Sequence, residues 1–366
     1  MKIVQVCPRY YPYPGGLERV VKNISDRLAL MNNEVTVYAT DPLIPTPRSR
    51  KIKNVEVKYY PSLAPNEAYF LPHPGMFADL LNEETDVLHA NNIQVLTTLV
   101  ANIVHKIRSG SRLVLSPFYH GRGHTKLAQM LWIPYRPIAK NVVRSVDAII
   151  VNSESQKSLI KRSFNSSAAM YKVYDGVNVQ EIRSAISYDI DKKRKILLYV
   201  GRLEKYKNIH LTIRALKYLP GNYDFYVIGR GPFRPELENL VNSLNLKSRV
   251  HFLGFQPDDV VYRWMKSADV FLHLSAVESF GMTCIESLAA GTPVIANEDG
   301  LGLSETIDLY PRDILPYRAE KDHCQVLVSL VQEAVSLKPT KADVSSFSWD
   351  SIAVTMDNIY ERIVKE

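Results

Sequence analysis

Residues 269–296 read DVFLHLSAVESFGMTCIESLAAGTPVIA, and this segment decides the fold class. The apolar run Asp269–Leu274 predicts a strand, the residues around Glu286 predict a helix, and Pro293–Ala296 predicts a second strand. A strand, a helix and a strand in this order form a β-α-β unit, whose two strands are parallel. The segment therefore predicts an α/β fold with a parallel sheet.

The same alternation of short β-branched runs and longer amphipathic segments continues along the chain. In the first half we expect strands at Lys2–Cys7, Glu34–Thr40, Val55–Tyr60, Asp86–Ala90, Arg112–Ser116 and Ala148–Asn152. In the second half we expect further strands at Lys195–Val200, Asp224–Ile228 and Arg249–Phe252. We predict two doubly wound, Rossmann-like domains, residues 1–188 and 189–347, with a ligand-binding cleft between them and a terminal helix at about 348–366.

Length and composition exclude several classes of protein. The chain has 366 residues, too many for one hydrophobic core, and its 46% hydrophobic and 23% charged residues exclude disordered and fibrous proteins. Its three scattered cysteines argue against a disulfide scaffold or a structural zinc site, so we expect a cytoplasmic location. We expect neither a signal peptide nor a membrane span. The formal net charge of +7 permits attraction to phosphates, and we expect no nucleic-acid partner.

Two loops that follow predicted strands could hold phosphate. After the first strand, Gly15 and Gly16 open a helix, whose N–H groups and positive dipole end suit an anion. The alternative is a plain turn. After Lys195–Val200, Arg202 and Lys207 lie five residues apart around a strand-to-helix turn, so both cations could reach one diphosphate. The alternative there is a solvated basic turn.

The strongest candidate site lies within 269–296 itself. Glu278 follows a predicted strand and Glu286 lies in the next helix, about 12 Å further along if the intervening residues are helical. This exceeds the roughly 5 to 9.5 Å of a hydrolase acid and base pair, so the carboxylates are better placed to hold two ends of a long ligand. The N–H groups from Phe280 to Thr283 start the helix and could receive a phosphate. A surface loop for Glu278 and packing or capping for Glu286 are the alternatives.

Together these motifs resemble those of the family 4 retaining glycosyltransferases. The matching residues are Glu278-x7-Glu286 with Ser-Phe-Gly between, the Ala-Ala-Gly-Thr-Pro-Val-Ile-Ala ending at Ala296, Gly201-Arg202-Leu with Lys207, and Gly15-Gly16. The resemblance implies the GT-B fold, with two Rossmann-like domains facing across a cleft and the terminal helix crossing back to the first. It also implies transfer of a hexose-type sugar from a UDP- or GDP-linked donor to an acceptor hydroxyl.

The resemblance further implies how the donor is held. Arg202 and Lys207 would hold the diphosphate, helped by the glycine pair of the other domain, while Glu286 would bind the ribose and Glu278 the donor sugar beside the reacting carbon. The amides of the helix start would bind sugar hydroxyls and the distal phosphate: Phe280, Gly281, Met282 and Thr283.

Three more positions complete the implied site. Gly229 and Phe255 match the family's base-binding walls, and His120 in Pro-Phe-Tyr-His-Gly corresponds to an active-site histidine near the sugar's 6-position. A loop or core histidine is the alternative for His120. The residues implied to be catalytic are His120, Glu278, Arg202 and Lys207.

Front-side displacement is the expected route to retention, because no second carboxylate motif in the N-terminal half offers a nucleophile. We therefore expect no metal and no cofactor beyond the nucleotide-sugar co-substrate. Asp189 and Asp191 resemble a metal motif of another glycosyltransferase fold, but they lie in a charged stretch that is typical of a solvated linker.

Two stretches depart from the family pattern. Asp175-Gly176-Val177-Asn178 exchanges the acid and the amide of the usual Asn-Gly-Val-Asp. Beyond Ala296, Glu305 fits an expected acid, but Leu309–Pro316 stands in place of the family's glycine-led strand.

The acceptor side is expected in the N-terminal domain, after His120. Cations interleave there with Leu131, Trp132, Ile133, Tyr135 and Ile138, as on a surface that rests on anionic lipid. The hypothesis is a peripheral enzyme on the cytoplasmic membrane face with a carbohydrate or lipid-linked acceptor; the alternative is a core helix with a solvated face. Two rival functions are a nucleotide-sugar epimerase of the same fold and a catalytically silent nucleotide-sugar-binding protein.

Overall fold

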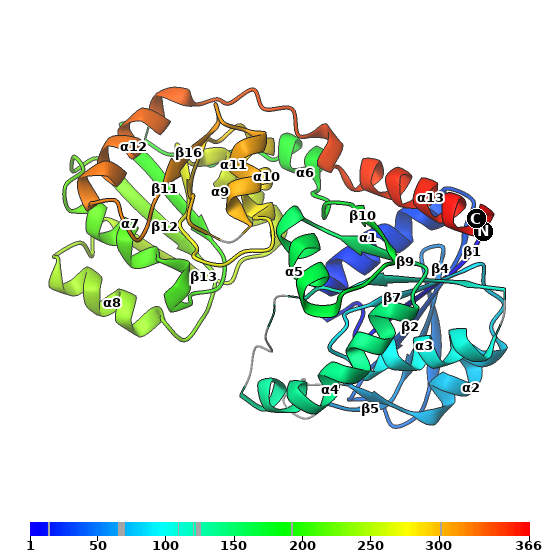
Figure 1. Cartoon of the computed structure of the whole chain (residues 1–366). Helices are drawn as coiled ribbons and strands as arrows, with labels where there is room; N and C mark the ends of the chain where they lie inside the picture. Colours follow the sequence, from blue (N-terminus) through cyan, green and yellow to red (C-terminus); the bar gives the residue numbers. More distant parts are fainter. Residues whose placement is uncertain are drawn as a thin grey trace. The chain divides into compact units, whose positions relative to one another are not determined.

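The computed structural model describes residues 1–13, 15–64, 70–108, 110–119, 121, 126–191, 193–300 and 302–366, with the backbone alone at 126–128. It divides into two compact units, which are drawn in Figure 1. The N-terminal unit is Met1–Asp175 with Trp349–Glu366, and the C-terminal unit is Gly176–Ser348.

The break between the units comes earlier than the predicted one at residue 188. Helix α6 (Val179–Ser184) belongs to the C-terminal unit, because it packs against α9 (Asp258–Ser267) and α10 (Met282–Ala289). The predicted linker around Asp189 is therefore an internal loop of the C-terminal unit.

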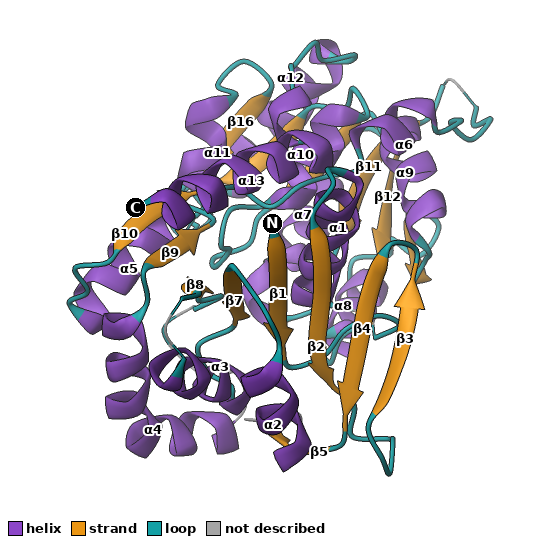
Figure 2. Cartoon of the chain, turned by 90° about the vertical axis from the view of Figure 1, so that its right-hand side faces the viewer, coloured by secondary structure: helices purple, strands orange, loops and turns teal. Residues whose placement is uncertain are grey.

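The described part of the N-terminal unit holds an eight-stranded sheet in the order β10-β9-β8-β7-β1-β2-β4-β3, part of which is seen in Figure 2. The strands are β1 (Lys2–Cys7), β2 (Glu34–Thr40), β3 (Arg48–Ile52), β4 (Val55–Tyr60), β7 (Val87–Asn91), β8 (Arg112–Ser116), β9 (Ala148–Val151) and β10 (Ala169–Lys172). Neighbouring strands are parallel, and the edge strand β3 runs antiparallel to β4. Both faces of the central strands are buried, which is why their sequences are continuous apolar runs.

Helices and a small strand pair complete the N-terminal unit. They are α1 (Gly16–Leu30), β5 (Ser62–Leu63), β6 (Leu71–Pro72), α2 (Pro74–Asn82), α3 (Leu96–Ile107), α4 (Lys126–Ser145), α5 (Glu154–Phe164) and α13 (Trp349–Lys365). The terminal helix α13 packs beside α1, and its Trp349, Met356 and Tyr360 join the core on that face of the sheet.

A buried polar cluster ties α13 to the centre of this sheet. The Tyr360 hydroxyl lies 2.5 Å from Nδ1 of His89 on β7, and Nε2 of His89 lies 2.9 Å from the Ser116 hydroxyl on β8. Gln5 on β1 donates from Nε2 to the same tyrosine oxygen at 3.3 Å. Burial lowers the pKa of His89 to about 3, so this imidazole is neutral at physiological pH.

The C-terminal unit has a parallel sheet whose described strands follow the order β13-β12-β11-β14-β15-β16. Its strands are β11 (Lys195–Val200), β12 (Tyr223–Ile228), β13 (Val250–Gly254), β14 (Val270–His273), β15 (Val294–Asn297) and β16 (Ile314–Tyr317). Its remaining helices are α7 (Ile209–Leu216), α8 (Arg234–Ser243), α11 (Leu303–Leu309) and α12 (Cys324–Leu337), with short 3-10 turns at Lys205–Lys207 and Ser345–Phe347.

The strand β16 is present although Leu309–Pro316 lacks the expected leading glycine. It is the edge strand of its sheet, and its Pro316 is exposed. An edge strand tolerates proline, because it can turn the missing N–H side toward solvent.

In each sheet there is one pair of neighbouring strands at which the direction in which successive strands are added reverses. In the C-terminal unit this pair is β11 and β14, and in the N-terminal unit it is β1 and β7. In doubly wound sheets, ligands bind at such a switch point, outside the carboxyl ends of the strands. The loops that follow β11 and β14 are therefore the first place to look for a site.

Candidate active site

A charged pair lies at the switch point of the C-terminal unit. Lys207 comes from the turn after β11 and Glu278 from the loop after β14, and the lysine Nζ donates to Oε1 of the glutamate. Both side chains are largely buried, at 12% and 19% exposure. The structure thus brings together two residues that the sequence predicted to be catalytic.

His273 completes this charged group, and the sequence analysis missed it. This last residue of β14 places Nε2 2.9 Å from Oε1 of Glu278, while its Nδ1 lies 3.3 Å from the Thr283 hydroxyl. Burial by itself would raise the pKa of Glu278, but the charges and hydrogen bonds of His273 and Lys207 outweigh it and lower that pKa to about 2. Glu278 is therefore a carboxylate at any physiological pH.

Arg202 lies in the same loop as Lys207, but its side chain points into solvent. It is 72% exposed and pairs with Glu204 at 2.9 Å. The loop itself is held in place, because the buried Tyr199 hydroxyl donates to the carbonyl oxygen of Arg202 at 2.9 Å. The backbone of Arg202 is thus held in place, while its guanidinium lies in solvent.

The predicted helix start lies directly after Glu278. Helix α10 begins at Met282, with Gly281 before it in the left-handed region at φ 90°, so fewer of the residues between the two glutamates are helical than expected. Phe280 is buried, and Thr306 donates to its carbonyl oxygen. Thr283 lies in the first turn, where helix N–H groups lack intrahelical partners and favour anions. Glu286 is buried further along the helix.

The predicted base-binding positions lie at the same edge of the sheet. A Cβ atom on Gly229 would come within 1.8 Å of the Gly201 carbonyl oxygen, so only glycine lets the loops after β11 and β12 approach this closely. Gly229 also donates its N–H to the carbonyl oxygen of Gly254, 2.7 Å away on β13. Phe255 follows that strand and is exposed, with the guanidinium of Arg230 5.9 Å from its ring centre.

In the N-terminal unit, a carboxylate of the chain itself lies beside the glycine pair. Gly15 precedes α1, and a Cβ on it would lie 2.0 Å from Oε2 of Glu18, whose buried carboxylate turns back toward the helix start. Arg9 donates to Oε1 of Glu18 at 3.1 Å. Gly16 is exposed, and a Cβ atom added to it would meet no other atom within 4 Å. The position that the sequence analysis gave to a phosphate is thus next to a carboxylate of the chain.

His120 lies outside the described residues.

Two family models match the chain one after the other. "Glycosyltransferase Family 4" matches residues 14–181, and "Glycosyl transferases group 1" matches residues 181–312. The chain belongs to the family 4 glycosyltransferases. The GT-B class of fold predicted for it is confirmed by the two parallel α/β units and by solved structures of the same fold.

Known proteins resemble this glycosyltransferase over different lengths. An uncharacterised glycosyltransferase of Methanocaldococcus jannaschii is 32% identical over 232 residues, which is 58% of this chain and 59% of that protein. The Campylobacter jejuni N-acetylgalactosamine-N,N'-diacetylbacillosaminyl-diphospho-undecaprenol 4-alpha-N-acetylgalactosaminyltransferase is 32% identical over 160 residues, 43% of each chain. These two matches therefore span about half of each relative. The crystal structure of HepE from Anabaena in complex with UDP superposes with a TM-score of 0.73 at 18% identity, covering 99% of this chain and 100% of that one.

Helix α4, which the sequence analysis expected on the acceptor side, differs from the prediction in one respect. Trp132 and Tyr135 of α4 are buried, at 8% and 6% exposure, and their rings pack at a tilt against one another in the core instead of facing a membrane. The exposed face of α4 carries the apolar Met130, Ile133 and Ile138 beside the cations Arg136, Lys140 and Arg144. Among the described helices, none is both long and apolar enough to cross a membrane.

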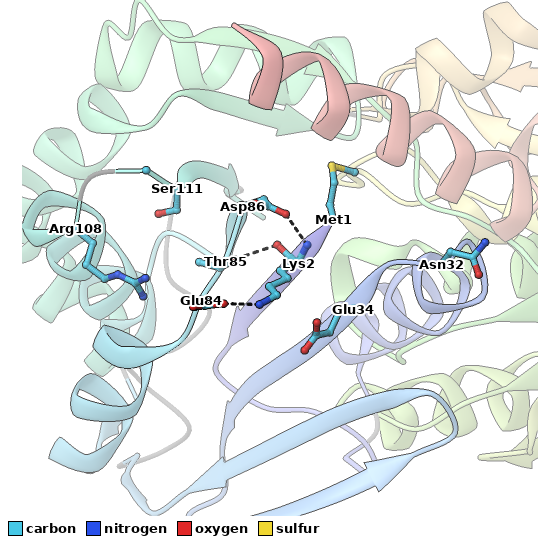
Figure 3. Close-up of a pocket in the computed structure, with 10 residues that line it drawn as sticks. Met1, Lys2, Asn32, Glu34, Glu84, Thr85, Asp86, Arg108 and Ser111 are labelled. Carbon is cyan, nitrogen blue, oxygen red and sulfur yellow. Dashed lines mark hydrogen bonds and ion pairs between the residues drawn. The ribbon is translucent and has the colours of Figure 1, made fainter.

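A pocket of about 560 Å³ lies at the amino ends of the strands of the N-terminal sheet, which is the edge opposite their carboxyl ends (Figure 3). Lys2 pairs there with Glu84, and the Lys2 backbone N–H donates to Asp86 at 2.7 Å. This pocket lies at the amino ends of the strands, the edge at which doubly wound folds do not bind their ligands.

Proposed function

We propose that this protein is a retaining glycosyltransferase that moves a hexose-type sugar from a UDP- or GDP-linked donor to an acceptor hydroxyl. The observation that carries the proposal is the buried pair of Lys207 and Glu278 at the switch point of the C-terminal sheet. A cation for phosphate and an anion for sugar hydroxyls there suit the two halves of a nucleotide sugar. The UDP bound by HepE, a protein of the same fold, supports a nucleotide ligand.

The donor diphosphate would lie between the loop after β11 and the start of α10. Arg202 is free to rotate toward it, since its present partner Glu204 is joined by an exposed ion pair, which contributes little. Lys207 supplies the second cation, and the first turn of α10 supplies N–H groups and a positive dipole end. Glu286 on the same helix would take the ribose hydroxyls.

The reaction would proceed by front-side displacement. The acceptor oxygen attacks the sugar's anomeric carbon from the face of the leaving group, the bond from that carbon to the phosphate oxygen breaks, and the acceptor proton passes to that departing oxygen. Arg202, Lys207 and the helix start stabilise the charge that develops on the diphosphate. These positive charges can do the work of a metal ion, so we propose that none is required. Transfer should then continue at its full rate in excess chelator, whereas a rate restored only by added Mg²⁺ or Mn²⁺ would contradict this.

The acceptor would be a carbohydrate or lipid-linked glycan at a membrane surface. The exposed face of α4 combines Ile133 with the cations Arg136, Lys140 and Arg144, and such a face binds anionic lipid through both apolar burial and charge. The Campylobacter relative, whose name specifies a diphospho-undecaprenol acceptor, supports this class of substrate. The protein would therefore bind peripherally to the cytoplasmic face of a membrane.

A donor panel tests the function. Thermal unfolding is followed with nucleotide sugars one at a time, and a donor at a hundred times its Kd should stabilise the protein by about 2.7 kcal/mol. Arg202→Ala should then weaken donor binding about tenfold or more, because it removes charge-assisted bonds to phosphate. Arg234→Ala, in the same unit but paired with Glu238, is the matched control.

Transfer is then measured with the selected donor and a lipid-linked acceptor. Glu278→Gln should abolish it while nucleotide binding survives. Unchanged transfer in both the Arg202 and the Glu278 variants would refute the site, and epimer formation without acceptor would favour the epimerase.

Flotation with phosphatidylglycerol vesicles at low salt tests the membrane face. The wild type should float, and Lys140→Glu with Arg144→Glu should not. The control pair, Lys247→Glu with Lys341→Glu, changes the net charge equally at exposed positions of the other unit. Failure of the wild type to bind, or equal loss in both pairs, would reject the membrane face.

A further inference from the structure

One carboxylate oxygen of Glu278 accepts two hydrogen bonds. Lys207 and His273 both donate to Oε1, and among the described residues they are the two side chains that hydrogen-bond to this carboxylate. An ionised carboxylate offers acceptor sites on both oxygens. Two donors on Oε1 therefore fix the plane of the carboxylate and leave Oε2 to accept a hydrogen bond from a ligand.

The hydrogen bond to Glu278 also places one proton on His273. Because the Glu278 carboxylate can only accept, the proton must be on Nε2 of the imidazole. Nδ1 lies 3.3 Å from the Thr283 hydroxyl, so a second hydrogen bond joins the ring to the first turn of α10. A continuous chain thus runs from the first turn of α10 through the imidazole to Glu278.

The two donors to Oε1 differ in how firmly they are held. His273 is the last residue of a buried central strand, and its side chain is 5% exposed. Lys207 has a flexible four-carbon stem, and the proposed function gives its ammonium a second partner, the donor diphosphate. When the ammonium is shared with that phosphate, the imidazole is the donor that still holds the carboxylate.

We propose that His273 is a positioning residue, which orients Glu278 so that Oε2 receives the donor-sugar hydroxyl and which couples that orientation to Thr283. This inference rests on the proposed function. His273 touches no reacting atom, and it acts through Glu278. A histidine with a merely structural role would support the fold and have no separate effect on the sugar half of the donor.

Three substitutions separate these roles. His273→Leu removes both hydrogen bonds at similar volume. His273→Gln carries an amide that reaches about as far as Nε2, so it can still donate to Glu278, while the shorter His273→Asn keeps a polar group near Nδ1 only. His251→Leu, at a half-buried histidine on β13 of the same sheet, is the matched control.

Each variant is assayed for transfer, for affinity toward the intact nucleotide sugar, and for affinity toward the nucleoside diphosphate alone. We expect His273→Leu and His273→Asn to lower kcat/KM by about 10- to 100-fold, the range for losing a hydrogen bond to a charged group. His273→Gln should recover a large part of this loss. Affinity for the nucleoside diphosphate should stay within about twofold in all four variants, which also shows that the binding unit is folded.

Three results would overturn the inference. The first is wild-type kcat/KM in His273→Leu. The second is an equal loss of affinity for the nucleoside diphosphate and for the nucleotide sugar, which is the signature of a structural role. The third is a glutamine variant no better than the asparagine variant. If the wild type transfers no sugar, the proposed function is wrong. If the wild type transfers sugar and His273→Leu is equally active, the proposed function stands and only the role of His273 is wrong.

Discussion

The buried His89 gives the N-terminal unit a defined sensitivity to acid. The imidazole lies between β7, β8 and α13 with both ring nitrogens hydrogen-bonded, and burial lowers its pKa to about 3. In the unfolded chain a histidine has a pKa of about 6.5. Between these values the unfolded state binds more protons, so the stability present above about pH 6.5 is lost progressively as the pH falls toward 3.

The size of this effect follows from the pKa difference. At one pH unit below the histidine pKa of the unfolded chain, the free energy of unfolding has fallen by about 1.4 kcal/mol. A shift from about pH 7.5 to pH 5 should therefore lower it by about 2 kcal/mol through His89 alone. His89→Gln keeps a polar side chain at this position and cannot titrate. It should therefore be less stable than the wild type at neutral pH but lose about 2 kcal/mol less on acidification.

Urea unfolding followed by tryptophan fluorescence measures the difference. In a Trp264→Phe background, the remaining tryptophans, Trp132 and Trp349, both belong to the N-terminal unit. His73→Gln, at an exposed histidine of the same unit, is the control, and it should keep the wild-type pH dependence because His89 remains.

Asp175 makes the comparison between variants necessary. Burial raises the pKa of this carboxyl to about 6, so its contribution to stability has the opposite sign in the same pH range. The wild-type curve alone therefore mixes both groups, and the difference between wild type and His89→Gln isolates the histidine. Equal loss of stability on acidification in those two proteins would refute the reasoning.

Two other predictions concern single positions. Gly229→Ala should destabilise the C-terminal unit by about 3 kcal/mol or more, because its Cβ would meet the Gly201 carbonyl oxygen. Gly254→Ala, also at positive φ but in open space, should lose only about 1 to 2 kcal/mol, and equal losses in thermal unfolding would contradict the close approach. Because burial raises the pKa of Asp175, the protonated acid is favoured below about pH 6 and stability is lost as the pH rises through that value. Asp175→Asn should flatten this part of the pH profile in the same unfolding assay, and an unchanged slope would argue against it.

Most of the fold could be predicted from the sequence, because strands buried on both faces are continuous apolar runs. The strands β1, β2 and β11 begin and end where the sequence places them. The short edge elements could not be predicted in this way. The exposed β3 carries four exposed residues in a row, and β16 contains a proline, so neither has the pattern of a buried strand.

The misplaced aromatic residues of α4 have a different cause. The sequence analysis took the alternation of cations with Trp132 and Tyr135 as a surface that rests on lipid, and kept a core helix with a solvated face as the alternative. Those two residues and Ala139 follow one another at spacings of three and four, which is the spacing of a single helix face. Periodicity would have assigned them to the core and left Ile133 on the opposite side, where the structure has it.

The charged group around Glu278 shows what motif spacing cannot supply. The sequence identified Lys207 and Glu278, but their contact depends on β11 and β14 being neighbours, although β12 and β13 lie between them in the chain. A signal for His273 did exist, since it is a histidine in an otherwise apolar strand that precedes a predicted acidic site by five residues. A polar group in a doubly buried strand needs a partner, and the nearest loop at the strand's carboxyl end is where that partner must be sought. That argument leads from the strand to Glu278 without a motif.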